Sequence, residues 1–331
     1  MYDAGIQTSA LVRLAYRPRL GVITSNAGLA TSPSYSIIIA VCDDWIPLNH
    51  CLRSIAQQTN GPRFDVTIVD DGSKQPAPEF IRDWKSCYPL TIVRQPHAGV
   101  ASARNRGIRD SKGSVLVFVD ADCRLRGGCL SAFDSTVRDS PQDNCFQLRL
   151  IGDRSHLVGR AEELRLITLQ DHMLRPNGCI QYLNTAGFAI RRDRVDAGGE
   201  TFDSSVRRGE DTLLLAKLMK RGELPRFVPN AVVQHSIQRS LIGCFLKDIR
   251  SGYLEGEADK KIASKGVRIR VGYRERLRML LSMWKTSGEP SIGRAGYFVL
   301  LARQTLERIV SVACRQLRPG SHSRAQVDPC R

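Results

Sequence analysis

The sequence predicts an α/β fold with a mostly parallel sheet flanked by helices and a basic helical appendage near its C-terminal end. Segments typical of strands and of helices alternate along the first half of the chain. The predicted strands are continuously apolar, as expected where helices cover both faces of a parallel sheet. Most of the excess positive charge follows this alternating region.

Four apolar runs rich in β-branched residues are predicted as strands, and the amphipathic segments between them as helices. The strands are predicted at 36–41, 66–69, 90–93 and 114–119. The helices are predicted at 46–58, 79–86 and 98–109. In the first helix, Leu48, Leu52 and Ile55 recur at helical spacing, which gives it one apolar face.

The length and charge of the chain predict its division into domains. At 331 residues it exceeds what one small core needs. Residues 241–331 hold 18 Lys and Arg against eight Asp and Glu, or +10 of the net charge of +16. Such a basic segment is expected to meet phosphate groups or anionic lipid, and it is also typical of nucleic-acid-binding tails. We expect a flexible extension at 1–33, a globular domain at 34–240, a basic helical appendage at 241–317 and a disordered tail at 318–331.

Cysteine spacing and the absence of long apolar runs predict the compartment. The ten cysteines form no Cys-x-x-Cys pair and no cluster with His at metal spacing, so we expect neither a disulfide framework nor a zinc site. No secretion signal is recognised, and no run approaches the ~20 apolar residues of a spanning helix. A cytoplasmic chain is expected, either soluble or peripheral on the cytoplasmic face of a membrane.

Two carboxylate pairs follow predicted strands. Asp70 and Asp71 come directly after the second strand and before a turn, where Asp commonly caps a helix. Asp120 and Asp122 follow the fourth strand, and residues two apart in an extended backbone project to the same side. Two such oxygens suit a hard divalent ion such as Mg²⁺ or Mn²⁺, although a solvated strand end is an equally common interpretation.

A third acidic pair opens a predicted helix. Glu210 and Asp211 precede a segment with Leu213, Leu214 and Leu218 on one side. In isolation they would be read as first-turn charges that favour the helix dipole. A short strand ending near His235 follows, and the histidine alone would be read as an ordinary polar residue. Together and in this order, the three acidic elements indicate a site.

Eight short motifs between about residues 35 and 240 carry a family resemblance. They are Ile37-Ile38-Ile39, Leu52-x-Ser54-Ile55-x-x-Gln58-Thr59, Val69-Asp70-Asp71-Gly72-Ser73, Gly99-Val100-Ala101-x-Ala103-Arg104-Asn105-x-Gly107, Phe118-Val119-Asp120-Ala121-Asp122, Asn184-x-Ala186-Gly187-Phe188-Ala189-Ile190-Arg191-Arg192, Gly209-Glu210-Asp211-Thr212 and His235. In this order and spacing, the set resembles the family 2 glycosyltransferases of the GT-A fold.

The resemblance implies an inverting transfer of one sugar from a nucleoside-diphosphate sugar, of the UDP or dTDP type, to an acceptor hydroxyl. Asp211 then corresponds to the catalytic base, and Glu210 to an acceptor contact or a supporting group. Asp122 corresponds to a ligand of Mn²⁺ or Mg²⁺, with His235 as a further metal or diphosphate contact. The implied acceptor is a glycan or a lipid-linked precursor of a surface polysaccharide.

The resemblance also implies a set of donor-binding residues. Asp71 would accept from the nucleobase, while Asp70 supports the turn. Asp120 would contact the ribose or the sugar, and Arg104 would meet the diphosphate or brace the carboxylates. The donor-binding set is Ala40, Asp43, Asp71, Arg104 and Asp120.

Two departures from the family pattern bear on specificity. Ala40-Val41-Cys42-Asp43 stands where the family usually has Pro-x-Tyr-Asn, which leaves the base preference open. Gln238-Arg239-Ser240-Leu241 lacks the Trp of the processive members, so we expect one sugar per encounter. A GT-A-like nucleotidyltransferase and a non-catalytic basic membrane-binding or nucleic-acid-binding protein remain as alternatives. The aromatic content of 6% argues against nucleic acid.

The segment 294–317 predicts an amphipathic helix. Its apolar face comprises Phe298, Leu301, Ala302, Ile309, Val312 and Ala313. Its polar face comprises Arg303, Glu307, Arg308 and Arg315. Such a helix either packs across the catalytic domain or lies in the interface of an anionic cytoplasmic leaflet.

Overall fold

The computed structural model describes residues 35–196, 200–236, 240–264 and 273–316. The chain divides into two compact units, Met1–Ser32 and Pro33–Arg331, and the described residues all belong to the second. The predicted extension at 1–33 and the predicted tail at 318–331 lie outside the described residues.

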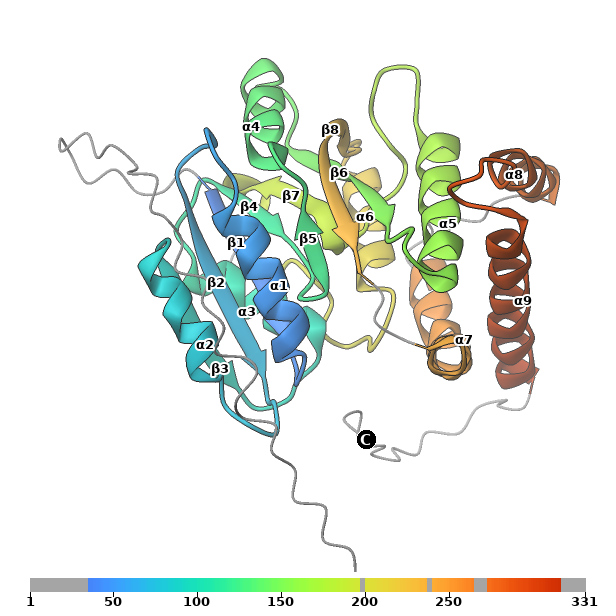
Figure 1. Cartoon of the computed structure of the whole chain (residues 1–331), viewed down its shortest axis with the longest axis horizontal. Coiled ribbons are helices and arrows are strands. Elements are labelled where there is room, and N and C mark those ends of the chain that lie inside the picture. The colour runs from blue at the N-terminus through green and yellow to red at the C-terminus, as the bar shows by residue number, and fades with distance from the viewer. Residues whose placement is uncertain (1–34, 197–199, 237–239, 265–272, 317–331) are drawn as a thin grey trace, which may run out of the picture. The chain divides into compact units, whose positions relative to one another are not determined.

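One mixed sheet of eight strands organises this unit (Figure 1). Across the sheet the order is β3-β2-β1-β4-β7-β6-β8-β5. Strands β1 to β4 are parallel, β7 is antiparallel to both β4 and β6, β6 is parallel to β8, and β5 is antiparallel to β8. The strands are β1 (Tyr35–Val41), β2 (Phe64–Asp71), β3 (Leu90–Gln95), β4 (Val115–Phe118), β5 (Cys123–Leu125), β6 (Cys145–Gly152), β7 (Phe188–Arg191) and β8 (Arg226–His235).

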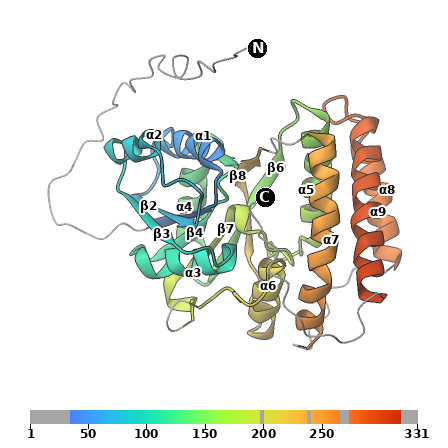
Figure 2. The same cartoon turned by 90° about the horizontal axis from the view of Figure 1, so that it is seen from below.

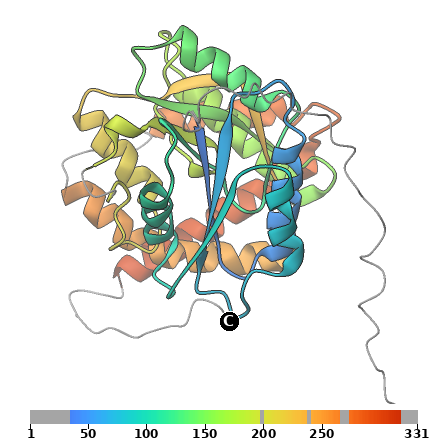
Figure 3. The same ribbon diagram turned by 90° about the vertical axis from the view of Figure 1, so that its left-hand side faces the viewer.

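Helices cover both faces of the sheet, as the continuous apolarity of its strands predicts. Helices α1 and α2 lie on one side and α3 and α6 on the other (Figures 2 and 3). The helices up to β8 are α1 (Trp45–Ala56), α2 (Glu79–Arg82), α3 (Val100–Asp110), α4 (Cys129–Asp139), α5 (Leu157–Met173) and α6 (Glu210–Lys220). Short 3₁₀ segments lie at η1 (Asp83–Ser86), η2 (Thr185–Gly187) and η3 (Arg192–Arg194).

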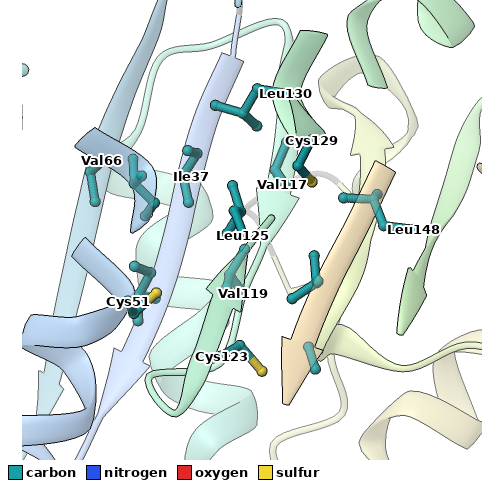
Figure 4. Close-up of a cluster of buried hydrophobic side chains, with 14 of the residues drawn as sticks. Ile37, Cys51, Val66, Val117, Val119, Cys123, Leu125, Cys129, Leu130 and Leu148 are labelled. Carbon is teal, nitrogen blue, oxygen red and sulfur yellow. The ribbon is translucent and has the colours of Figure 1, made fainter. Parts of the chain in front are cut away.

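The central strands bury alternate residues in two different cores. Ile37 and Val117 belong to the core on the α1 side, which Figure 4 shows in close-up. Ile38 and Phe118, one position further along each strand, belong to the core on the α3 side. Every residue of β4 is therefore buried, and the predicted α/β class is confirmed.

Eight described cysteines are free thiols, and no disulfide forms among the described residues. Cys51, Cys123 and Cys129 are buried in the core on the α1 side, and Cys145 in the core on the α3 side. Burial among apolar groups raises the pKa of these four thiols, because it disfavours the charged thiolate.

Three further helices follow β8, namely α7 (Leu241–Ser264), α8 (Tyr273–Thr286) and α9 (Arg294–Gln316). Helix α9 packs against α5 and α7, and α8 also contacts α5 (Figure 2). Leu164 of α5, Met283 of α8 and Leu300 of α9 share a small core. Among the described residues, no helix is both long and apolar enough to cross a bilayer.

Candidate active site

The turn after β2 is held by its first carboxylate. Asp70 Oδ1 accepts a hydrogen bond from the Ser73 backbone N–H at 2.8 Å, and Asp70 Oδ2 lies 3.5 Å from Arg94 Nε. Gly72 has a φ of 75°, and a Cβ added there would lie 2.6 Å from the backbone nitrogen of His97. The structure thus places Asp70 in the last residues of β2, from where it supports the turn, and only glycine fits between this turn and the loop after β3.

Asp71 points into the loop that leads from β3 to α3. Its Oδ1 accepts from the Ala98 N–H at 2.9 Å and from Gln95 Nε2 at 2.7 Å. Its Oδ2 accepts from the Gly99 N–H at 2.9 Å. The carboxylate is buried and fixes the start of α3. Its predicted contact with a nucleobase stays a prediction.

The two predicted donor residues at the end of β1 and in the turn after it lie at the same edge of the sheet. Ala40 is half-buried near the end of β1. Asp43 adopts a φ of 60°, its N–H donates to Ser73 Oγ at 2.9 Å, and its Oδ1 accepts from the Lys74 N–H at 2.7 Å. The turns after β1 and β2 are therefore tied together, and donor binding by Ala40 and Asp43 stays a prediction.

Arg104 of α3 gathers three carboxylates, and we call this set the Arg104 cluster. Arg104 Nη2 donates to Asp120 Oδ1 at 2.9 Å and Nη1 to Glu210 Oε1 at 2.7 Å, while Asp211 Oδ1 lies 3.8 Å from Nη1. Burial disfavours the cation, but the three negative charges outweigh burial and raise the pKa of Arg104. Of the two roles expected for Arg104, the structure shows bracing, and contact with a diphosphate stays a prediction.

Asp211, in the first turn of α6, is held toward η2. Its Oδ2 accepts from the Thr185 N–H at 3.2 Å, and its Oδ1 accepts from Thr185 Oγ1 at 3.0 Å. Burial and the nearby charges of Glu210 and Asp120 raise the pKa of Asp211 to about 7, although Arg104 opposes this effect. A carboxylate with this pKa is a stronger base than an ordinary Asp and titrates near neutrality.

A second group forms where β5 pairs with β8. This pairing sets Cys123 opposite His235, and His235 Nε2 lies 3.2 Å from Asp122 Oδ2. Burial would lower the pKa of His235, but the carboxylates of Asp122 and Glu162 outweigh it and raise the value to about 10. Residues more than one hundred positions apart in the chain therefore meet at this point.

Glu162 of α5 completes the surroundings of the histidine. Its Oε1 lies 3.6 Å from His235 Nδ1. Both Glu162 oxygens are also bound by Arg165, at 2.5 and 2.9 Å. Glu162 is 4% exposed, and its carboxylate contacts the Arg165 guanidinium and the His235 imidazole. The opposite ring nitrogen, Nε2, faces Asp122.

The residues around His235 fit a divalent cation. Donor atoms of Asp122, Cys123 and His235 lie within 4.8 Å of one another. Cys123 is fully buried with a raised thiol pKa and lies among apolar side chains (Figure 4), so it is a poor donor for a hard ion. The half-exposed Asp122 carboxylate and His235 Nε2 are suitable donors. A metal held there stays a prediction, and its ligands would be these two residues.

Sequence reasoning missed Glu162, Arg165 and the role of Thr185. Glu162 and Arg165 are three residues apart on a helix, which is the spacing of an ordinary solvated ion pair. The contact of Glu162 with His235 depends on the placement of β8, which no local pattern reveals. Thr185 lies inside the Asn184-x-Ala186-Gly187 motif, so the motif located this residue without revealing its contact with Asp211.

The parallel half-sheet, the carboxylates at its carboxyl edge and the antiparallel return through β7 agree with the GT-A fold that the sequence motifs imply. Residues 36–198 match the family model described as Glycosyl transferase family 2. Residues 36–198 of the chain are therefore a family 2 glycosyltransferase domain.

Two curated relatives illustrate the similarity. Glycosyltransferase AglE of Haloferax volcanii is 32% identical over 117 residues, or 34% of this chain and 38% of that protein. The pre-mycofactocin glycosyltransferase of Mycobacterium tuberculosis is 27% identical over 197 residues, or 57% of this chain and 41% of that protein. The chain thus spans about two fifths of these relatives.

Solved structures show the same fold at low identity. The mannosyltransferase PcManGT of Pyrobaculum calidifontis, solved with GDP-Man and Mn²⁺, matches with a TM-score of 0.54 and 16% identity over 87% of this chain and 81% of that one. TarS 1-349 of S. aureus, solved with UDP-GlcNAc, matches with a TM-score of 0.50 and 13% identity over 86% and 92%. These likenesses support the GT-A fold.

Proposed function

We propose that the chain transfers one sugar from a nucleoside-diphosphate sugar to an acceptor hydroxyl, with inversion at the anomeric carbon. The observation that carries this proposal is the Arg104 cluster, in which Asp211 is held by Thr185 with a pKa of about 7. A base of this strength suits the removal of a hydroxyl proton near neutral pH.

We assign the donor side to the ends of β1, β2 and β4. GDP-Man in PcManGT and UDP-GlcNAc in TarS support a nucleotide-sugar donor. We propose UDP or dTDP as the nucleotide, with Asp71 accepting from the base and Asp120 contacting the ribose or the sugar. Ala40 and Asp43 would form the wall of this site, because Ala40 pairs with Val69 of β2 and the turn that carries Asp43 is tied to the turn after Asp71.

We assign Mn²⁺ or Mg²⁺ to Asp122 and His235. When bound, the cation would neutralise the charge that develops on the departing diphosphate. His235 must be neutral at Nε2 to serve as a ligand, so we expect metal binding to release the proton that the imidazole shares with Asp122. Mn²⁺ in PcManGT supports this choice of metal.

On the acceptor side, Asp211 would take the hydroxyl proton as the hydroxyl oxygen attacks the anomeric carbon from the face opposite the diphosphate. The bond to the diphosphate oxygen breaks as the new glycosidic bond forms, which inverts the carbon. Thr185 orients Asp211 through its N–H and its hydroxyl. Glu210 is bound to Arg104 and therefore supports the cluster rather than competing for the same proton. We propose a glycan or a lipid-linked precursor of an envelope polysaccharide as the acceptor, and one transfer per encounter.

The decisive experiment measures donor turnover for Asp211→Asn. With a panel of nucleotide sugars and Mn²⁺, the wild-type chain should release nucleoside diphosphate. Asp211→Asn should retain donor affinity while turnover falls by about 10²–10⁴, the usual contribution of a general base. Glu79→Gln is the matched control, because Glu79 also lies in the first turn of a helix and is exposed.

Three outcomes would each contradict one part of the assignment. Release of pyrophosphate from a nucleoside triphosphate would indicate a nucleotidyltransferase instead. An inactive Glu210→Gln combined with an active Asp211→Asn would transfer the role of base to Glu210. Full activity in excess EDTA would remove the metal from the proposal and leave the base in place.

A further inference from the structure

Large apolar side chains are exposed along one side of the two last helices. Leu277, Leu281 and Trp284 lie on α8, and Phe298, Leu301, Ile309 and Val312 lie on α9. Each is at least 37% exposed. We call these seven residues the apolar outer face. Soluble domains rarely expose a contiguous apolar patch of this kind without a function for it.

Helical spacing places the α9 members on a single stripe. Phe298, Leu301, Ile309 and Val312 follow the three-residue and four-residue spacing of one helix side. The opposite side carries Leu300, which is buried against α5 and α8, and Arg303, which forms a buried ion pair with Asp248 of α7. The helix is therefore anchored by its polar side, and its apolar side turns away from α5 and α7.

This arrangement combines the two alternatives for segment 294–317. The helix packs on the catalytic part, as one of them requires, but through Leu300 and Glu307 rather than through the apolar stripe. The apolar stripe stays exposed, as the other requires.

An aromatic contact joins the two helices of the outer face. The rings of Trp284 and Phe298 lie 6.2 Å apart, and the Arg294 guanidinium lies over Trp284 at 3.7 Å. Exposed cations flank the apolar residues on both helices. They are Arg274, Arg278, Lys285, Arg294 and Arg308.

We propose that the apolar outer face docks into the interface of an anionic membrane. The apolar side chains would enter the boundary of the acyl chains, and the flanking cations would meet lipid phosphates. A second copy of the chain is the less favoured occupant, because a two-fold contact would set the same cationic rim against itself. The positive charge of the flanking cations thus favours a negatively charged surface as the partner.

The same helix reaches the acceptor side of the site. Glu307 of α9 lies 3.1 Å from Arg208, two residues before Glu210. Docking of α9 would therefore hold the Arg104 cluster close to the lipid headgroups, where a lipid-linked acceptor is presented. This last step rests on the proposed glycosyl transfer, whereas membrane docking itself does not.

The test is sedimentation of the full chain with vesicles of phosphatidylcholine alone or mixed with phosphatidylglycerol. Binding should require the anionic lipid and weaken at 1 M salt, where screening shortens to about 3 Å. The double variant Phe298→Ser, Ile309→Ser should bind at least about tenfold more weakly. Ile46→Ser is the control, because Ile46 of α1 is as exposed as Phe298, at 58% each.

A variant that removes positive charge measures how much the flanking cations contribute to membrane binding. Arg274→Gln, Arg278→Gln and Lys285→Gln together should weaken binding by roughly a hundredfold. The control is Arg53→Gln, Arg82→Gln and Lys85→Gln, which removes three exposed cations from α1, α2 and η1. Release of nucleoside diphosphate in lipid-free solution should be unchanged in all four variants, so loss of docking is distinguishable from failure of the transfer chemistry.

Three results would overturn the proposal. One is equal binding to vesicles of phosphatidylcholine alone. Another is wild-type binding by the Phe298→Ser, Ile309→Ser variant. The third is a dimer in lipid-free solution that this variant dissociates, which would assign the apolar outer face to a second copy of the chain.

Discussion

The Arg104 cluster and the apolar outer face distribute polarity in opposite ways. In the cluster, a cation is buried inside the fold, where charge is costly, and it binds three partly exposed carboxylates. On α8 and α9, apolar side chains are held outside, although buried positions lie one residue away from Trp284, Leu301 and Val312. Both regions depart from the usual pattern of apolar residues inside and charges outside. The comparison teaches that each departure needs a partner. The buried Arg104 has its three carboxylates, and the membrane is the partner that we propose for the apolar outer face.

The largest effect is expected from breaking the cluster. Arg104→Leu removes the cation and leaves Asp120, Glu210 and Asp211 to repel one another. We expect the free energy of unfolding at pH 7.5 to fall by about 3–5 kcal/mol, measured by urea denaturation. Lowering the pH should recover part of this loss as the carboxylates become protonated.

Arg109→Leu is the control, because Arg109 lies on the same helix and pairs with an exposed Glu200. It should change stability by less than about 1 kcal/mol. If Arg104→Leu also lowered the free energy of unfolding by less than about 1 kcal/mol, the ion pairs of Arg104 with the three carboxylates would not stabilise the fold. If Arg104→Leu does not fold, Arg104→Lys should fold with reduced stability.

Neighbouring leucines test the other side of the comparison. Leu300 is 2% exposed and Leu301 is 37% exposed. Leu300→Ala should lower the free energy of unfolding by about 2–4 kcal/mol, because it leaves a cavity between α5, α8 and α9. Leu301→Ala should cost less than about 1 kcal/mol in lipid-free solution. Equal costs in thermal or urea unfolding would show that the apolar outer face is covered in solution.

A smaller effect is expected where a buried carboxylate faces the proposed metal ligand. Glu162→Gln removes the charge behind His235 and should weaken Mn²⁺ binding about 10–100-fold, measured by electron paramagnetic resonance of free Mn²⁺. Glu163→Gln is the control, because Glu163 is equally buried but contacts Gly152 and Arg154 instead. Equal Mn²⁺ affinity of the two variants would remove Glu162 from the metal site.

The smallest effect concerns pH. Asp211 acts as a base only when ionised, and its pKa is raised to about 7. With saturating metal, kcat/KM should rise with pH up to about 7 and then level off, so the rate at pH 6 is about tenfold below the plateau. Glu210→Gln removes a charge that raises this pKa, and it should move the midpoint to lower pH. A flat profile between pH 5.5 and 8 would argue against Asp211 as the base.

The parallel half of the fold was predictable because its strands are continuously apolar, although only the inner strands are buried on both faces and the edge strand β3 is partly exposed. The runs at 36–41, 66–69, 90–93 and 114–119 correspond to β1, β2, β3 and β4. The patterns predict no strand at β5, β6 or β7. Strand β5 has only three residues, and the pairings of β6 and β7 depend on partners far along the chain, so local apolarity does not reveal them.

The same limit applies to the site. The carboxylates at strand ends and helix starts could be predicted, because the local sequence pattern shows where a strand ends and where a helix begins. Glu162 and Thr185 could not be, because they reach the site from elsewhere in the chain. Arg104 was expected to brace the carboxylates only through the family resemblance. In α9, spacing identified the apolar stripe, but a helical period does not tell which side faces the protein. The ion pair between Arg303 and Asp248 turns the polar side of α9 toward α7.

The buried thiols have a consequence for observing how the layers of this protein open. Cys51 lies in the core on the α1 side, Cys145 in the core on the α3 side, and Cys244 against Val158 between α7 and α5. A thiol reacts as the thiolate and only when reagent reaches it, so each position is silent until its own layer separates. Alkylation followed by mass spectrometry would therefore record three opening rates in one native sample. If Cys244 is alkylated fastest, α7 separates from α5 before either core of the sheet opens.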